Sequence, residues 1–188
     1  MTGSVENVRS PGNDHILDAA DALFYARGVQ NVGMDELRTA SGASLKRLYQ
    51  QFPSKEALVV AWLRRRDEQW RGRLAAHVDA VADPTQRVLA VFDWLEGWFA
   101  EPGFRGCAFV NTFGELGATS DPVAAEARRH KELFFAYVTG LVTAAGGSTA
   151  LADQIALLAE GAIVTAAVLG TPDAARTGKA AAAVLAAA

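Results

Sequence analysis

Cysteine, leader patterns and long apolar runs are scarce in this sequence, and each scarcity excludes a class of protein. The chain of 188 residues has one cysteine, Cys107, which rules out an internal disulfide framework and fits a reducing compartment. No uninterrupted apolar run reaches the roughly 18 residues that cross a bilayer, so no membrane partner is expected. The first thirty residues lack a charged and then apolar leader pattern, which predicts a cytoplasmic protein.

Metal-binding and catalytic patterns are also missing. The three histidines, His15, His77 and His130, are scattered. No Glu-x-x-His pair is present to build a di-iron site, and one cysteine with dispersed histidines gives no zinc spacing. No glycine-rich phosphate loop follows a strand pattern. The sequence therefore predicts no metal, no cofactor and no enzyme.

Apolar side chains at helical spacing are abundant. Hydrophobic residues make up 51% of the chain and charged residues 21%, which is enough to build a core and argues against disorder. Ile16, Ala20, Leu23 and Phe24 share one helical face, and similar stripes recur along the chain. The expected helices cover 13–28, 34–41, 45–52, 55–81, 84–100, 105–117, 121–145, 151–169 and 173–187, and residues 1–12 are expected to form a polar tail. The predicted fold class is all-α, with about nine helices.

Residues 34–52 form two short helical segments that meet at a Ser-Gly-Ala-Ser turn. Gly42 supplies the permissive backbone of a tight turn, and Ser44 is a suitable N-cap for the second segment. The apolar positions expected to face inward are Leu37, Ala40, Leu45, Leu48 and Phe52. This layout predicts a helix-turn-helix, although an ordinary helical hairpin with a solvated basic face would fit the same pattern.

The outward positions carry long hydrogen-bonding side chains. Lys46 or Arg47 could read guanine edges in a major groove, and Gln50 could read adenine. Thr39, Ser44 and Tyr49 suit phosphate contacts, which fix the register of a protein on DNA. Lys55 opens the next helix, where a phosphate is a plausible partner of the helix N-terminus. Net charge gives little support, since it is −3 overall, with nine basic against seven acidic residues in 1–66.

Residues 15–62 resemble the N-terminal domain of the TetR family (TetR/AcrR-like regulators). The specific part is Gly-x-Ser-x-x-x-Leu-Tyr-x-x-Phe-x-x-Lys-Glu, from Gly42 to Glu56. Three positions depart from the usual family pattern. Gly33 stands where Ser or Thr usually caps the second helix, Arg38 replaces a common Ala and could add a phosphate contact, and Gln50 stands where His is frequent.

The resemblance implies a helix-turn-helix DNA-binding domain over 13–57 and a ligand-binding and dimerisation domain over 58–188. It implies a homodimer on a palindromic operator of double-stranded DNA, most simply a repressor that a small, largely apolar effector releases. The alternatives are an all-α enzyme, with Cys107 and a distant histidine as a nucleophile pair, or a partner-binding scaffold without DNA binding. Salt-dependent binding to a duplex would separate the regulator from both.

Aromatic side chains crowd residues 92–137, with a few polar groups among them, as in a small-molecule site. The candidate ligand residues are Trp94, Trp98, Cys107, Phe109, Asn111, Phe113, Glu115 and Phe134, although at helical spacing most aromatics are simply core. Trp94 lies off the main apolar stripe, so it either lines a second surface or is exposed.

The segment 151–169 is apolar on nearly every side and must be covered on more than one face. Its small residues, Ala159, Ala162, Ala166 and Gly170, recur at a spacing of three or four and would let another helix approach closely. A homodimer interface is the expected cover, and burial within one chain is the alternative.

Overall fold

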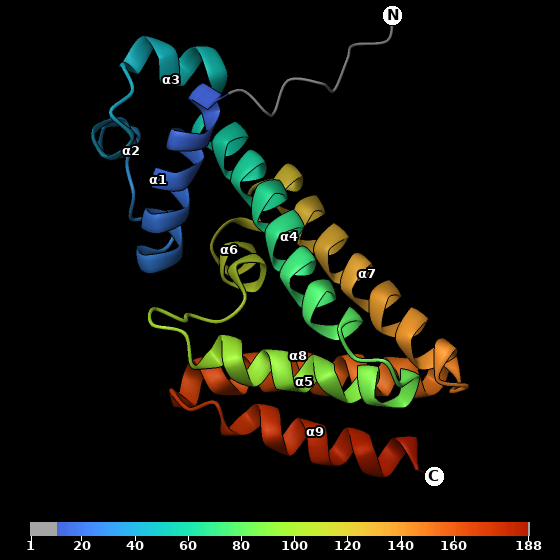
Figure 1. Cartoon of the computed structure of the whole chain (residues 1–188). Helices are drawn as coiled ribbons and strands as arrows, with labels where there is room; N and C mark the ends of the chain where they lie inside the picture. Colours follow the sequence, from blue (N-terminus) through green and yellow to red (C-terminus); the bar gives the residue numbers. More distant parts are fainter. Residues whose placement is uncertain (1–10, 188) are drawn as a thin grey trace, which may run out of the picture. The chain divides into compact units, whose positions relative to one another are not determined.

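The helices observed follow the periodicity of the sequence closely. The computed structural model describes residues 11–187, with side chains from residue 14, and within that range it contains nine helices and no strand (Figure 1). The helices are α1 (Pro11–Arg27), α2 (Met34–Ser41), α3 (Leu45–Gln51), α4 (Lys55–Asp79), α5 (Pro84–Phe99), α6 (Ala108–Leu116), α7 (Asp121–Ala144), α8 (Thr149–Leu169) and α9 (Asp173–Ala186). The all-α fold class is thereby confirmed.

The differences from the expected bounds lie at helix ends. Helix α1 begins at Pro11, so residues 11 and 12 are helical rather than part of a tail, and the rest of the expected tail lies outside the described residues. Proline fits there because the first helical N–H has no partner within the helix in any case. Helix α6 is shorter than expected, because residues 105–107 stay outside it.

The chain divides into two compact units. Unit 1 comprises 11–67 and 108–127 of the described residues, and unit 2 comprises 68–107 and 128–187. Helices α4 and α7 each contribute one part to either unit. This division by packing does not follow the predicted functional boundary after residue 57, which stays a prediction.

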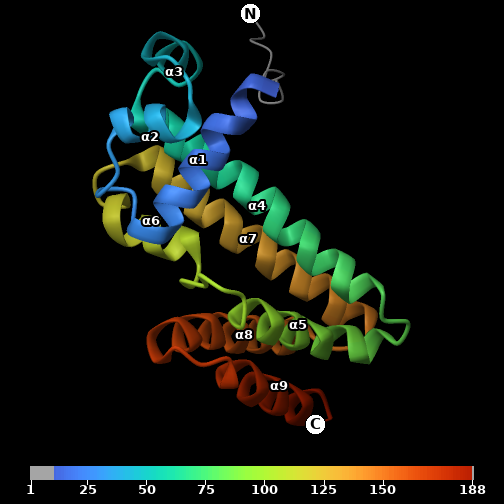
Figure 2. The same cartoon turned by 60° about the vertical axis from the view of Figure 1, so that its left-hand side comes forward.

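Unit 1 packs α1, α2 and α3 beside the first part of α4 (Figure 2). Its core contains Ile16, Phe24, Leu37 and Leu48, which are buried, together with Trp62 of α4. The Phe24 and Trp62 rings meet edge to face, with centroids 5.3 Å apart. The apolar stripe expected on α1 is therefore the face that α4 covers.

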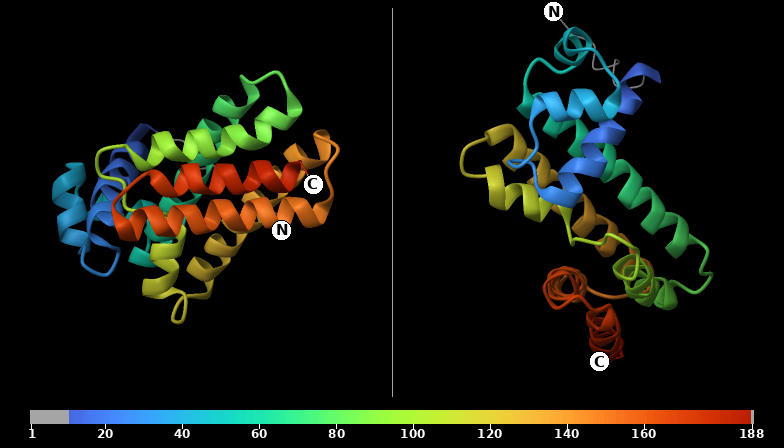
Figure 3. Two further views of the ribbon diagram at one scale, coloured as in Figure 1. Left: turned by 90° about the horizontal axis from the view of Figure 1, so that it is seen from below. Right: turned by 90° about the vertical axis from the view of Figure 1, so that its left-hand side faces the viewer.

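Unit 2 is built on α5, α8 and α9, where α9 lies against both of the others (Figure 3, left). A Cβ at Gly178 of α9 would stand 2.8 Å from Phe92 of α5, so only glycine allows this approach. The alanines Ala159, Ala162 and Ala166 are buried within the unit. The expectation that this small-residue stripe serves a partner chain is therefore wrong for the three alanines, because unit 2 already covers them.

The open face of α8 consists of other residues. Leu157 is 63% exposed and Val168 is 78% exposed, and Val164 and Leu169 are exposed as well. Their spacing of four and seven residues places Leu157, Val164 and Val168 on one side of the helix. An apolar stripe of this kind is typical of a helix that packs against something beyond its own chain.

By length and composition alone, α8 could also cross a bilayer, with a mean hydropathy of 1.6 over its best window. The sequence expectation considered only uninterrupted apolar runs and so did not single it out. Seven of its residues are buried in the protein, and Glu160 forms an ion pair with Lys131 of α7 at 2.5 Å. Both observations favour a helix packed in protein.

Candidate nucleic-acid interface

The turn between α2 and α3 has the geometry that its residues predict. Gly42 ends α2 in the left-handed region at φ 67°, and its N–H points to the carbonyl of Thr39. Ser44 has extended backbone, and its Oγ accepts a hydrogen bond from the Arg47 N–H at 3.2 Å. Gly33, in contrast, begins α2 without a side-chain cap. The expected turn role of Gly42 and the expected N-cap role of Ser44 are confirmed.

Three of the five expected inward positions are buried: Leu37, Leu48 and Phe52. Ala40 and Leu45 are exposed, so the expectation was wrong for them. Helical side chains lean toward the N-terminus of their helix. Leu45 is the first residue of α3, so its side chain leans toward the preceding turn and away from the buried Leu48. The burial of Leu48 thus determines which side of α3 faces away from the rest of unit 1.

The residues on that outer side are Lys46, Arg47, Tyr49 and Gln50, all of them exposed. Among the described residues, Lys46 and Arg47 form no ion pair. Elsewhere in unit 1 the arginines are neutralised: Arg27 pairs with Glu36, Arg38 with Asp35, Arg64 with Glu126, Arg65 with Asp18 and Arg66 with Asp21. Unneutralised positive charge is therefore concentrated on α3.

Two arginines of the α4 run, Arg65 and Arg66, hold α1, while Arg64 pairs with Glu126 of α7. Asp21 of α1 accepts hydrogen bonds from the Trp62 indole at 2.7 Å and from Arg66 at 2.5 Å. The Arg66 guanidinium also lies 3.8 Å from the centre of the Tyr25 ring. These contacts make the run a structural feature of unit 1, and α3 remains the basic surface.

The predicted phosphate contacts on α2 and at the start of α4 have partners within the chain. Arg38 pairs with Asp35, and the Thr39 hydroxyl donates to the Asp35 carbonyl at 2.9 Å. Lys55 is half-buried, and burial lowers its pKa while the carboxylate of Glu115 acts to raise it. A carboxylate of the same chain thus lies near the position that the sequence assigned to a phosphate.

Glu115 of α6 holds the turn that follows α1. Its Oε1 accepts from the Val29 N–H at 3.1 Å and its Oε2 from the Gln30 N–H at 2.7 Å. The Gln30 side chain returns a hydrogen bond to the Glu115 carbonyl at 2.6 Å. Successive backbone N–H groups of this kind form a concave anion site. The sequence offered no signal for this contact, because its partners are 85 residues apart.

Gly28 makes that contact possible and provides a test of it. Its φ is +82°, and a Cβ there would stand 2.8 Å from Glu115 Oε1. We expect Gly28→Ala to lower the free energy of unfolding by about 2–4 kcal/mol, through left-handed strain and displacement of the carboxylate from the two N–H groups.

The matched control is Gly42→Ala, where φ is +67° and a Cβ would meet nothing within 4 Å. It carries the backbone strain alone, at about 1–2 kcal/mol. Urea unfolding of both variants measures the difference. Equal losses would mean that the Glu115 contact adds nothing to the stability of unit 1.

Of the eight candidate ligand residues, the structure brings three together. In unit 2, Trp94, Trp98 and Phe134 surround Trp70, with ring centroids 5.0, 5.5 and 5.6 Å from it. Trp94 is buried, so the alternative that it is exposed is wrong. Trp70 sits at the centre of the cluster, yet its buried Nε1 has no hydrogen-bond partner among the described residues.

The other five candidates have different surroundings. Cys107 is buried in unit 2, with Lys131 Nζ 3.6 Å from its sulfur. In unit 1, Phe109 is buried, Asn111 and Phe113 are exposed, and Glu115 is engaged with the turn after α1. Their role in ligand binding stays a prediction.

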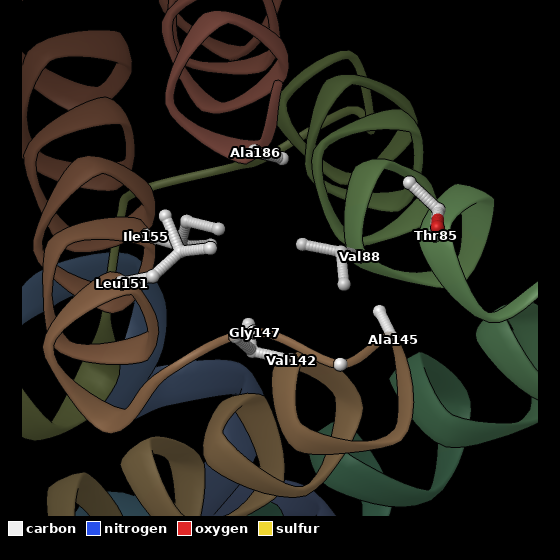
Figure 4. Close-up of a pocket in the computed structure, with 9 residues that line it drawn as sticks. Thr85, Val88, Val142, Ala145, Gly147, Leu151, Ile155 and Ala186 are labelled. Carbon is white, nitrogen blue, oxygen red and sulfur yellow. The ribbon is translucent and has the colours of Figure 1, made fainter. Parts of the chain in front are cut away.

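Two small hollows lie elsewhere. One of about 120 Å³ in unit 2 is walled by apolar groups such as Val88, Val142 and Ile155 (Figure 4). Another of about 210 Å³ in unit 1 lies beside Lys55 and Val59. Both are below the roughly 300 Å³ of common small-molecule pockets, and neither is lined by a candidate ligand residue.

Comparison with known proteins places this architecture among regulators. The sequence model of the family described as bacterial regulatory proteins, tetR family, matches residues 16–62. An uncharacterized HTH-type transcriptional regulator of Mycobacterium tuberculosis is 37% identical over 76 residues, which cover 40% of this chain and 38% of that protein. The HTH-type transcriptional activator FasR of Mycolicibacterium smegmatis is 34% identical over 92 residues, covering 47% and 42%. The chain thus spans less than half the length of these relatives.

The likeness to solved structures extends over nearly the whole chain. A TetR-family transcriptional regulator from Streptomyces coelicolor superposes with a TM-score of 0.85 at 26% identity, covering 95% of this chain and 96% of that one. A TetR-type regulator from Streptomyces avermitilis gives 0.74 at 29% identity, covering 93% and 98%. The relatives and the fold are those of transcriptional regulators rather than enzymes. Residues 16–62 are thus similar to the tetR family of bacterial regulatory proteins, and the fold of the whole chain is similar to that of TetR-family regulators.

Proposed function

We propose that this chain is a cytoplasmic transcriptional repressor that binds a palindromic DNA operator as a homodimer and is released by a small, largely apolar effector. The observation that carries the DNA-binding part is the positive charge of Lys46 and Arg47 on the exposed side of α3, which forms no ion pair with any described residue. Phosphates are the partners that such charges meet when a helix enters a major groove.

The capped N-terminus of α3 orients its side chains toward base edges. Arg47 and Lys46 have the donors for guanine, and Gln50 has the donor and acceptor pair for adenine. Ser44 and Tyr49 supply phosphate contacts that set the register. The further phosphate contacts are Arg38, Thr39 and Lys55. To reach a phosphate, Arg38 and Thr39 must first leave Asp35, and Lys55 must move away from Glu115.

The open face of α8 supports the homodimer. Two copies joined through Leu157, Val164 and Val168 would bury apolar surface that one chain leaves exposed. A two-fold dimer presents two α3 helices, and a palindrome presents two half-sites in the same symmetry.

The aromatic cluster around Trp70 supports an apolar effector with a hydrogen-bond acceptor, because the Trp70 indole N–H is buried and has no partner among the described residues. The candidate ligand residues of unit 2 are Trp94, Trp98, Cys107 and Phe134, and those of unit 1, taken by themselves, are Phe109, Asn111, Phe113 and Glu115. An effector releases DNA only to the extent that it prefers the state that binds DNA poorly.

The test is the double substitution Arg47→Ala with Tyr49→Ala. We expect it to abolish specific retardation of a promoter fragment while size-exclusion chromatography still shows a dimer. For the wild type, the logarithm of the affinity should fall linearly with the logarithm of salt concentration.

Arg27→Ala is the control, since it removes an exposed arginine of unit 1 that already pairs with Glu36. Retardation by the double variant at wild-type concentrations would overturn the site assignment. A reporter gene behind the operator distinguishes repression from activation, the activity that the name of the relative FasR carries.

A further inference from the structure

Leu45 is an apolar side chain that the fold leaves partly exposed. It is 45% exposed, as is Tyr49 one turn later, while Leu48 between them is fully buried. Among the described residues of α1 to α4, Leu45 and Tyr49 are the exposed large hydrophobic side chains, and both belong to α3. The exposure of Leu45 therefore coincides with the proposed DNA-binding surface.

We propose that Leu45 is a specificity-determining residue that contacts the C5 methyl group of a thymine in each operator half-site. This inference rests on the proposed function. The thymine methyl is the apolar group that base pairs present in the major groove, and a leucine side chain has no donor or acceptor for any other edge.

The position of Leu45 in α3 fits this role. It is the first residue of the helix, directly after the Ser44 cap, and the N-terminal residues of the second helix of a helix-turn-helix contact base edges. Lys46 and Arg47 follow it, form no ion pair with any described residue, and have the donors for guanine edges. Leu45 thus adds an apolar contact to a surface whose neighbouring side chains suit polar base edges.

The expected effect follows from the size of one methyl group. Burying a methyl-sized apolar group against leucine corresponds to about a three- to fivefold gain in affinity for each half-site. A palindrome that lacks the methyl in both half-sites should lose about tenfold or more.

The experiment replaces thymine by deoxyuridine, which has the same hydrogen-bonding edges but no methyl group. An operator is first selected with the wild-type protein from a pool of random duplexes. Each thymine of a half-site is then replaced singly, and affinity is measured by fluorescence anisotropy at one salt concentration. We expect a loss at one thymine of each half-site for the wild type and no loss for Leu45→Ala at that position.

Tyr49→Phe is the control on the same helix, since it removes a hydroxyl and keeps the ring. It should weaken binding to the thymine and deoxyuridine operators alike, and so keep the wild-type ratio between them. Circular dichroism will confirm that Leu45→Ala, at an exposed position, folds as the wild type does.

The result that overturns the proposal is wild-type binding that is indifferent to deoxyuridine at every position. An undiminished methyl effect in Leu45→Ala would overturn it as well. Both outcomes leave the DNA-binding function intact. If the wild-type protein selects no duplex at all, the proposed function fails and takes the Leu45 contact with it.

Discussion

The double substitution Leu157→Glu with Val168→Glu should turn the proposed homodimer into a monomer and remove the proposed operator affinity. Both side chains lie on the open face of α8, at 63% and 78% exposure in the single chain. In an isologous interface each substitution appears twice, so four carboxylates would face apolar surface or one another. Unpaired buried charges cost several kcal/mol each, and we expect the dimer dissociation constant to rise at least about a thousandfold.

Operator binding should fail with the dimer, because one α3 helix contacts a single half-site. Sedimentation velocity reports the mass of the protein, and anisotropy with a labelled operator reports the affinity. The control is Ala76→Glu, which adds one carboxylate at an exposed position of α4. The thermal unfolding of the Leu157→Glu, Val168→Glu variant should be close to that of the wild-type monomeric fold, since neither of these two side chains is part of the core. A variant that sediments as a dimer would show that the interface lies elsewhere.

The α8 face also shows where sequence reasoning stops. Periodicity identified the helix, and Gly170 marks its end in the left-handed conformation. The apolar composition gave no way to tell which side met the same chain. The structure assigns the small alanines to packing within unit 2 and leaves the larger Leu157 and Val168 open. Which face of a nearly uniform helix is covered depends on the neighbours, and the neighbours are set by the rest of the chain.

In the candidate DNA-binding surface too, some features could be predicted from the sequence and others could not. Gly42, Ser44 and Leu48 have local roles in a turn, a cap and an anchor, and these could be predicted because the signals lie within a few residues. Leu45 was misplaced because inward and flanking positions differ by little on a helix of two turns. The partner of Glu115 could not be predicted, since the two backbone N–H groups it binds carry no sequence signature.

A second large effect is expected from Trp62→Ala, which removes the side chain that joins α4 to α1. Trp62 is 1% exposed, packs edge-on against Phe24, and donates its indole N–H to Asp21 at 2.7 Å. Replacing a buried aromatic residue by alanine costs about 3–5 kcal/mol, out of the roughly 5–15 kcal/mol that stabilise a typical domain. We expect the melting temperature to fall by about 6–20 °C, measured by calorimetry alongside urea unfolding.

Trp62→Phe separates the two contributions of this side chain. It keeps a ring against Phe24 and removes the donor to Asp21, whose Oδ1 then retains Arg66. The loss should be about 1–2 kcal/mol, because one hydrogen bond to a charged group is removed and the carboxylate keeps a partner. A loss in Trp62→Ala no larger than that in Trp62→Phe would place the stability of unit 1 in the polar contacts of Asp21. A loss several times larger would place it in the apolar contact between α1 and α4, which involves the face of α1 that the periodicity of residues 16–24 marks as apolar.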